Sequence, residues 1–299
     1  MNILVVGSSN TDMTAEVPSI PVPGETVLGS DFRVSAGGKG ANQAVATARL
    51  GADVIFICSI GKDDLGIKSL TGLKKEGINT DFVFQKDTHS GVALIFVDKN
   101  GENSIGVAKG ANGLLSIEDI DKADIAFQSS EILLLQMETP IETVIHAAKK
   151  AKKYNKKVIL NPAPMTFDLP DDLIQNVDIL TPNETELTKI IAQFGNVEKL
   201  FSLGIENLVV TLGSKGADII YKNNRVEHLD AFKVNPVDTV GAGDCFNGAL
   251  TYLLFKGTSL KEAVIFATAA GALATLKKGA QEAMPTFSEV EKFMCERRN

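Results

Sequence analysis

Short apolar runs bounded by turn residues recur along the first two thirds of the chain. Six of them predict buried strands, at residues 3–6, 53–57, 132–136, 158–161, 179–181 and 208–212. Segments with apolar residues at helical spacing lie between several of these runs, at residues 40–50, 64–76, 140–154 and 185–191. Continuous apolar strands that alternate with helices predict a parallel sheet covered on both faces. Beyond residue 231 the pattern is helical, at residues 243–255, 260–276 and 288–297.

Two segments interrupt this alternation. Residues 13–35 contain three prolines and a period-2 stretch around Phe32 and Val34. Residues 92–107 are typical of a hairpin that turns at Asn100-Gly101. Together they predict a small β-layer beside the main sheet, and its position before and after a glycine-rich loop favours a lid over a pair of edge strands. We expect a single domain over residues 1–299.

Composition and charge limit the possible partners. With 44 % apolar and 22 % charged residues, the chain is typical of a soluble globular protein. Its net charge of −7 argues against nucleic acid or an anionic membrane as a partner. No apolar run reaches the roughly 18 residues of a membrane span, and the start has no basic leader region, so we expect a cytoplasmic protein.

One glycine-rich stretch is suited to an anionic ligand. Gly241, Ala242, Gly243 and Asp244 stand directly before an apolar helical pattern. The first N–H groups of a helix have no partners within it, and about half a positive charge at this end favours phosphate. Asp244 itself has two interpretations: a helix N-cap, or a general base that takes a proton from a hydroxyl attacking phosphorus.

Five more groups fall at predicted strand ends or helix starts, where sheets of this class bind ligands. They are Asn10 with Asp12, the run 37–43, Glu138, the run 183–186 and the run 211–216. Asn10 and Asp12 suit adjacent hydroxyls of a polyol, although the two residues taken alone favour an ordinary turn. Glu186 either complements a helix dipole or holds hydrated Mg²⁺. Phosphoryl transfer needs a base, an anion cradle, Mg²⁺ and exclusion of water, and each has a candidate here.

With these motifs the chain resembles the ribokinase-like carbohydrate kinases of the phosphofructokinase B type. The resemblance runs from Ile3 to about Pro285 and covers both family signatures, at residues 36–61 and 238–248. The runs 23–26, 161–164 and 278–281 resemble members that act on D-ribose. The resemblance implies a three-layer α/β/α fold with a mostly parallel central sheet and a small β-sheet lid. It also implies ATP-dependent phosphorylation of D-ribose at O5.

The same resemblance implies roles for individual residues. Asp244 would be the general base, and the Gly241, Ala242 and Gly243 amides would stabilise charge on the transferring phosphoryl group. The sugar would be bound by Asn10, Asp12, Gly38, Lys39, Asn42, Glu138 and Asp244. ATP would be contacted by Asn183, Thr211, Gly213, Ser214, Gly216, Gly243 and Thr268.

Cations and a partner subunit are implied as well. Mg²⁺ would lie near Glu186 through water, and an activating K⁺ would lie at the Asp238 carboxylate and at the carbonyls of Val240, Ala274, Lys277 and Gly279. The family resemblance further implies a homodimer built through the lid sheets. Two positions depart from the family: Ala283 replaces a Ser that ligates K⁺, and Thr268 replaces a His that often lines the adenine site. The first bears on K⁺ activation and the second on nucleotide preference.

Other functions remain open at this point. Within the same family the acceptor could be 2-deoxyribose, a hexose or a nucleoside, although a nucleoside needs a base pocket, and the chain has no Trp and only three Tyr. An NAD-dependent oxidoreductase would need Gly-x-Gly-x-x-Gly after the first strand, where Gly7 stands alone. A sugar sensor without catalysis is a third class, against which the intact run 241–244 argues.

Overall fold

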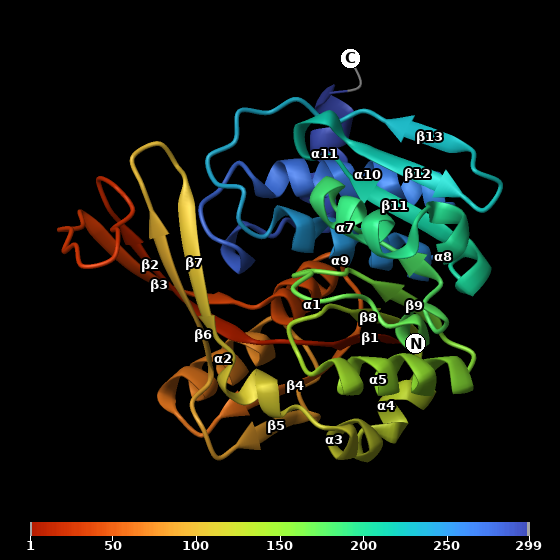
Figure 1. Cartoon of the computed structure of the whole chain (residues 1–299), viewed down its shortest axis with the longest axis horizontal. Helices are drawn as coiled ribbons and strands as arrows, with labels where there is room; N and C mark the ends of the chain where they lie inside the picture. Colours follow the sequence, from red (N-terminus) through yellow and green to blue (C-terminus); the bar gives the residue numbers. More distant parts are fainter. Residues whose placement is uncertain (1, 298–299) are drawn as a thin grey trace.

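A nine-stranded sheet forms the centre of the protein (Figure 1). The computed structural model describes residues 2–297. In spatial order the strands are β13 (Val226–Leu229), β12 (Ala217–Tyr221), β11 (Asn207–Thr211), β10 (Ile179–Leu180), β9 (Lys157–Leu160), β8 (Ser130–Leu135), β1 (Asn2–Val6), β4 (Val54–Gly61) and β5 (Val83–Lys86). All neighbours pair in parallel except β11–β12 and β12–β13. The six predicted strands all occur in this mostly parallel sheet.

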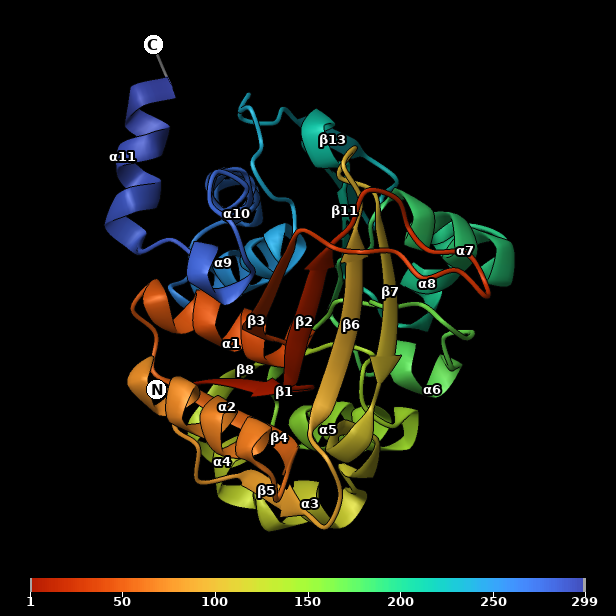
Figure 2. The ribbon, with the colours of Figure 1, turned by 90° about the vertical axis from the view of Figure 1, so that its left-hand side faces the viewer.

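Helices cover both faces of the sheet, which confirms the three-layer prediction (Figure 2). On one face lie α1 (Lys39–Arg49), α2 (Asp64–Lys75), α9 (Ala242–Phe255), α10 (Leu260–Ala274) and α11 (Phe287–Arg297). On the other lie α3 (Ile117–Lys122), α4 (Asp124–Ser129), α5 (Ile141–Lys153), α6 (Asp171–Ile174), α7 (Glu184–Phe194) and α8 (Val197–Leu203). Along β1, Ile3 and Val5 pack into the first layer whereas Leu4 and Val6 pack into the second. Burial on both faces is why the strands are continuously apolar.

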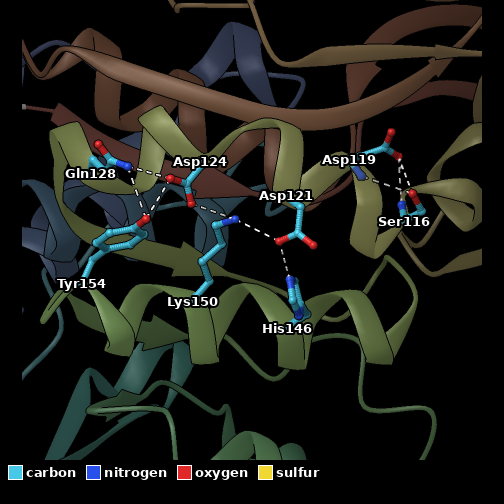
Figure 3. Close-up of polar contacts among 8 residues, drawn as sticks. All are labelled: Ser116, Asp119, Asp121, Asp124, Gln128, His146, Lys150 and Tyr154. Atoms are coloured by element: carbon cyan, nitrogen blue, oxygen red, sulfur yellow. Dashed lines mark hydrogen bonds and ion pairs between the residues drawn. The ribbon is translucent and has the colours of Figure 1, made fainter.

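A polar network joins α3 and α4 to α5 (Figure 3). The Lys150 ammonium lies 2.9 Å from both Asp121 and Asp124. His146 Nε2 lies 2.8 Å from Asp121 Oδ1, and the Tyr154 hydroxyl donates to Asp124 Oδ2 at 2.8 Å. Hydrogen bonds from His146 and Lys150 lower the pKa of Asp121, and those from Lys150 and Tyr154 lower the pKa of Asp124. Both carboxylates are therefore charged at neutral pH, and the network fixes the helices to one another.

The second sheet is smaller and lies beside the first, with its strands side by side in Figure 2. Its order is β3 (Asp31–Gly37), β2 (Asn10–Glu16), β6 (Gly91–Val97) and β7 (Asn103–Ala108). Only the central β2–β6 pair is parallel. The predicted small β-layer is thus present, and its role as a lid stays a prediction. Within residues 2–297 no helix is long and apolar enough to cross a membrane.

One expectation drawn from the residues alone is wrong. Asn10 and Asp12 favour a turn by composition, yet both lie inside β2. This strand follows β1 closely and pairs with β3 and β6 on its two sides, with Asn10 opposite both Gly37 and Gly91. Backbone pairing on both edges outweighs the local side-chain bonds that favour a turn. Both polar side chains are consequently held on a rigid strand.

Candidate active site

A cavity of about 890 Å³ separates the small sheet from two loops of the large one. From the small sheet, Asp12, Arg33 and Ser35 line it. The opposite wall is formed by residues 236–240, which lead into α9, and residues 278–280, which follow α10. Ligand sites of open α/β sheets lie at this carboxyl edge of the strands. Asp12, one of the seven residues predicted to bind the sugar, belongs to the lining of this cavity.

A second cavity of about 630 Å³ adjoins the first. Pro236 and Thr239 line both cavities, and the start of α9 lies between them. The second cavity contains six of the residues predicted to contact ATP: Thr211, Gly213, Ser214, Gly216, Gly243 and Thr268. Its walls also include Phe232, Val234 and Phe246, which suit a flat apolar group. Two adjoining cavities of different character can hold two substrates.

The start of α9 forms the boundary between the cavities. Gly241 is the N-cap residue with φ of 76°, a left-handed conformation that glycine adopts without strain. The Cys245 amide makes the first helical bond, at 2.8 Å to the Gly241 carbonyl, so the Gly243 and Asp244 amides precede the helical ladder. The Ala242 amide differs, because it donates to the Thr239 carbonyl at 3.3 Å. This helix end suits a transferring phosphoryl group.

Asp244 lies in the first turn of α9 and is 6 % exposed. Because Gly241 is the N-cap and the cap has no side-chain bond, the interpretation of Asp244 as an N-cap is wrong. Its Oδ2 accepts from Asn42 Nδ2 at 2.8 Å, and its Oδ1 accepts from Gln43 Nε2 at 3.0 Å. Both donors are neutral amides on α1, so they orient the carboxylate without an opposing charge. Such an oriented carboxylate can accept a proton from a hydroxyl.

Around Asp244 the structure gathers the other predicted sugar residues. The Lys39 amide donates to Glu138 Oε2 at 2.9 Å, and the Ser8 hydroxyl donates to the same oxygen. Attraction to Asp244, and then to Glu138, raises the pKa of Lys39, so its ammonium remains charged. Asp12 faces the same group of charges: burial, and then the carboxylates of Glu138 and Asp244, raise its pKa to about 7.

Asn10 and Gly38 complete the predicted sugar set. Asn10 Oδ1 accepts from Asn112 Nδ2 at 2.7 Å, in the short helix that follows β7. Gly38 precedes α1 and packs against the backbone of Ser9 and Asn10. Of the seven predicted sugar residues, Asp12 lines the first cavity, and the other six are not among its lining residues. Asn42 Oδ1 is buried and has no hydrogen-bond partner among residues 2–297, so an acceptor is available to a bound hydroxyl.

Asn183 and Glu186, predicted to contact ATP and hydrated Mg²⁺, are not among the lining residues of the second cavity. Asn183 adjoins Thr211 through a backbone bridge. Asn183 Oδ1 accepts from the backbone amide of Glu186 at 2.8 Å. The backbone amide of Asn183 in turn donates to Glu186 Oε2 at 2.9 Å. This reciprocal pair is a capping box, so one oxygen of each side chain serves α7. Glu186 is 8 % exposed, and burial raises its pKa.

Asp238 joins the two loops on which the K⁺ ligands were predicted. Its Oδ1 accepts from the Val240 amide at 3.0 Å, and its Oδ2 accepts from the Gly279 amide at 2.9 Å. Over residues 2–297 no group of three or more His, Cys, Asp or Glu side chains could hold a metal ion, so a cation here would depend on backbone carbonyls. One carboxylate with carbonyls fits a hard cation. Ala283, buried in this region, offers no side-chain oxygen.

Several polar residues of the site were not assigned a role from sequence. Gln43 Nε2 donates both to Asp244 and, at 3.2 Å, to Asn161 Oδ1. Gln136 Nε2 donates to Gln43 Oε1 at 2.7 Å, so a chain of buried amides leads to Asp244. Gln43 stands within the run 37–43 and Gln136 at the end of a predicted strand, but their partners come from separate elements. Only the folded arrangement shows what these amides hold in place.

Comparison with known proteins identifies a family for this arrangement. A family model described as "pfkB family carbohydrate kinase" matches residues 1–287. A ribokinase of Haemophilus influenzae is 41 % identical, with 98 % of each chain covered. A deoxyribokinase of Salmonella typhi is 37 % identical, over 98 % of this chain and 99 % of the relative. A structure of Arabidopsis thaliana ribokinase complexed with ribose and ATP superposes with a TM-score of 0.87 and 33 % identity, covering 98 % of both chains.

Proposed function

Because the chain belongs to the pfkB family of carbohydrate kinases, we propose that it transfers the γ-phosphoryl group of ATP to O5 of D-ribose. The products are ribose 5-phosphate and ADP. One observation carries the proposal: the start of α9, whose first turn carries the buried Asp244 carboxylate, lies between two adjoining cavities. Sugar occupies the cavity next to Asp12, and ATP occupies the one next to Thr211 and Gly213.

Asp244 acts as the general base in this mechanism. Asn42 and Gln43 hold its carboxylate toward the 5-hydroxyl, which loses its proton to Asp244 as its oxygen attacks the γ-phosphorus. The bond to the ADP oxygen breaks as the new P–O bond forms. The amides of residues 241–243 stabilise the charge on the transferring group, with Gly243 better placed than Ala242 because its amide has no turn partner.

Two cations are proposed beside ATP. Mg²⁺ would neutralise phosphate charge, and Glu186 would reach it through water. K⁺ would take the Asp238 carboxylate with carbonyls of Val240, Ala274, Lys277 and Gly279. The contacts of Asp238 with the Val240 and Gly279 amides support this, since they bring the two ligand-bearing loops together. The proposed use of ATP fits an enzyme of the cytoplasm. The net charge of −7 supports the proposal that neither nucleic acid nor a membrane is a partner.

The 2-hydroxyl decides between the two acceptor sugars named among the relatives. Asn42 Oδ1 and the Asp12 carboxylate are buried acceptors near the sugar site. A sugar that lacks a hydroxyl donor leaves such an acceptor unpaired, at a cost of about 1–3 kcal/mol. We therefore expect ribose to be preferred over 2-deoxyribose by about 10- to 100-fold in kcat/KM.

ADP release from Mg-ATP tests this with D-ribose, 2-deoxyribose, fructose and adenosine, each in K⁺ and in Na⁺. A preference for ribose supports the proposal, and a higher rate in K⁺ supports the cation site. A preference for another acceptor would support the proposed kinase activity but show that its substrate is not ribose. Absence of turnover with all four would contradict the proposed function.

Ribose affinity is expected to increase with pH around neutrality. With its pKa raised to about 7, mainly by burial, Asp12 is mostly protonated at pH 6 and mostly ionised at pH 8. Sugar hydroxyls donate to the ionised form, so the ribose Kd should fall by up to about ten-fold from pH 6 to pH 8. Titration calorimetry at pH 6, 7 and 8 measures the ribose Kd. Asp12→Asn should bind ribose more weakly with a flat profile; an unchanged pH dependence in that variant would contradict the role of Asp12.

The homodimer is proposed to form through the small sheets. Phe32 and Val34 of β3 and Leu94 and Phe96 of β6 are between 38 % and 62 % exposed. Met13 of β2 is paired with Val34 and Leu94, so these side chains share the face directed away from the cavity. An apolar face of this kind suits a second copy of the chain.

Phe32→Asp is expected to convert the dimer to a monomer, because it would bury a carboxylate in an apolar interface. Sedimentation velocity between about 1 and about 50 μM, a range of about fifty-fold, measures the change. Val226→Asp is the matched control, since Val226 is 56 % exposed on β13 of the large sheet. A monomeric wild-type protein at the highest concentration would exclude the dimer.

A further inference from the structure

Two ion pairs cross the first cavity from the small sheet. Arg33 of β3 reaches Asp238, with Nη2 3.5 Å from Oδ2. Glu16 of β2 reaches Lys278, with Oε1 3.6 Å from Nζ. The Glu16–Lys278 pair is exposed, at 41 % and 65 % of the side chains, whereas Asp238 is only 13 % exposed. The two pairs bridge the same parts of the molecule, but only the Arg33 pair involves a largely buried carboxylate.

Asp238 controls the approach to the anion-binding amides. Its carboxylate holds the Val240 amide, and Val240 is followed directly by Gly241, the left-handed N-cap of α9. The same carboxylate holds the Gly279 amide of the neighbouring loop. The position of this side chain is therefore linked by hydrogen bonds to the residue before Gly241 and to the loop at Gly279.

A carboxylate removed from water is costly unless a positive charge lies beside it. Over residues 2–297, Arg33 is the only side-chain cation within ion-pair distance of Asp238. Strand alternation explains its position, because Phe32 and Val34 point to the outer face of the small sheet and Arg33 points to the cavity. The charge that balances Asp238 is thus carried by the sheet that covers the sugar.

We propose that Arg33 is a positioning residue, which pairs with Asp238 when the small sheet covers the cavity and thereby orients the loop before Gly241 for phosphoryl transfer. This inference rests on the proposed kinase function. The guanidinium does not contact the reacting atoms; it acts through Asp238 and the Val240 amide. When the small sheet moves away, Arg33 leaves with it, Asp238 loses its charge partner, and the anion-binding loop is no longer fixed.

A monovalent cation at Asp238 would supply the same positive charge from solution. Arg33 and that cation are therefore expected to compensate for one another at one carboxylate. Loss of the guanidinium should increase the dependence of the protein on K⁺. This consequence can be measured without turnover, because a cation that binds the folded state raises its melting temperature.

The test compares Arg33→Gln and Arg33→Lys with Glu16→Gln, which breaks only the other bridging pair. For Arg33→Gln we expect kcat to fall by about 10- to 100-fold, with KM values for ribose and ATP within about three-fold. Arg33→Lys should recover part of kcat, and free guanidinium should raise kcat of Arg33→Gln. Glu16→Gln should keep kcat within about two-fold of wild type. The increase in melting temperature from Na⁺ to K⁺ should be larger in Arg33→Gln than in wild type.

Three results would overturn the inference. Equal kcat values for Arg33→Gln and Glu16→Gln would show that Arg33 only helps to hold the sheet. An increase in the KM for ATP with unchanged kcat would make Arg33 a ground-state nucleotide contact. An identical K⁺ effect on melting temperature in Arg33→Gln and wild type would show that the two charges are not coupled. Wild-type turnover in the same assay checks the kinase function separately, and the melting experiment decides the coupling even if ribose is not the acceptor.

Discussion

Asp244→Asn is expected to lower kcat by about 10²- to 10⁴-fold while ribose still binds. The amide has nearly the volume of the carboxylate but cannot accept the proton of the attacking hydroxyl. One of the two donors from Asn42 and Gln43 keeps an acceptor in the variant, so the side chain remains in place. ADP release gives kcat, and titration calorimetry gives the ribose Kd. The expected pattern is a large loss in kcat with a Kd within about ten-fold of wild type.

Asp172→Asn is the matched control for this prediction. Asp172 makes an exposed ion pair with Lys149 on the helical layer that carries α5 and α6, and such pairs contribute little. We expect its kcat to be unchanged. Turnover of Asp244→Asn near the wild-type value would exclude Asp244 as the base. If the variant lost both ribose binding and turnover, the main role of Asp244 would instead be to bind the sugar.

The main sheet could be predicted because burial on both faces makes its strands continuously apolar. Residues 3–6 of β1 and 132–135 of β8 all contribute to one of the two cores. The strand β2 could not be predicted over its whole length, because its first residues are polar and its partners β3 and β6 are distant in sequence. The edge strand β13 was also hard to predict, because only one of its four residues is buried and it pairs with one neighbour.

The candidate site was predictable where local backbone geometry needs particular residue types. Gly241 with its positive φ and Gly38 before α1 are such positions, and both stand in recognisable motifs. Side-chain partners were not predictable, because they join remote elements. Gln43 reaches Asp244 and Asn161 only after α1, α9 and the end of β9 have packed together. Arg33 had no sequence signal, since its importance depends on the distance across a cavity.

Gly38→Ala is expected to destabilise the fold and to weaken sugar binding. Gly38 has φ of 89°, and a Cβ atom there would lie 2.6 Å from the Asn10 nitrogen and 2.9 Å from the Ser9 Cα. These neighbours are backbone atoms of the β1–β2 connection and cannot rotate away. Backbone strain of about 1–3 kcal/mol and overpacking of about 1–3 kcal/mol together predict a loss of about 2–6 kcal/mol in the free energy of unfolding.

The same substitution should change the affinity for ribose but not the affinity for ADP. Moving Gly38 away from Asn10 displaces the Lys39 amide that donates to Glu138, so ribose affinity should fall by at least about ten-fold. The second cavity contains none of these residues, so ADP should bind within about three-fold of wild type.

Urea unfolding and calorimetry with ribose and with ADP measure these effects, and Gly72→Ala is the control. Gly72 lies in α2, where an added Cβ atom would have nothing within 4 Å, so its replacement should be neutral or stabilising by about 0.5–1 kcal/mol. Normal ribose affinity in a destabilised Gly38→Ala would show that the start of α1 only supports the fold. Loss of both ligands in a folded variant would show that the two cavities depend on one another. Only selective loss of ribose agrees with a sugar site formed where α1 meets β2.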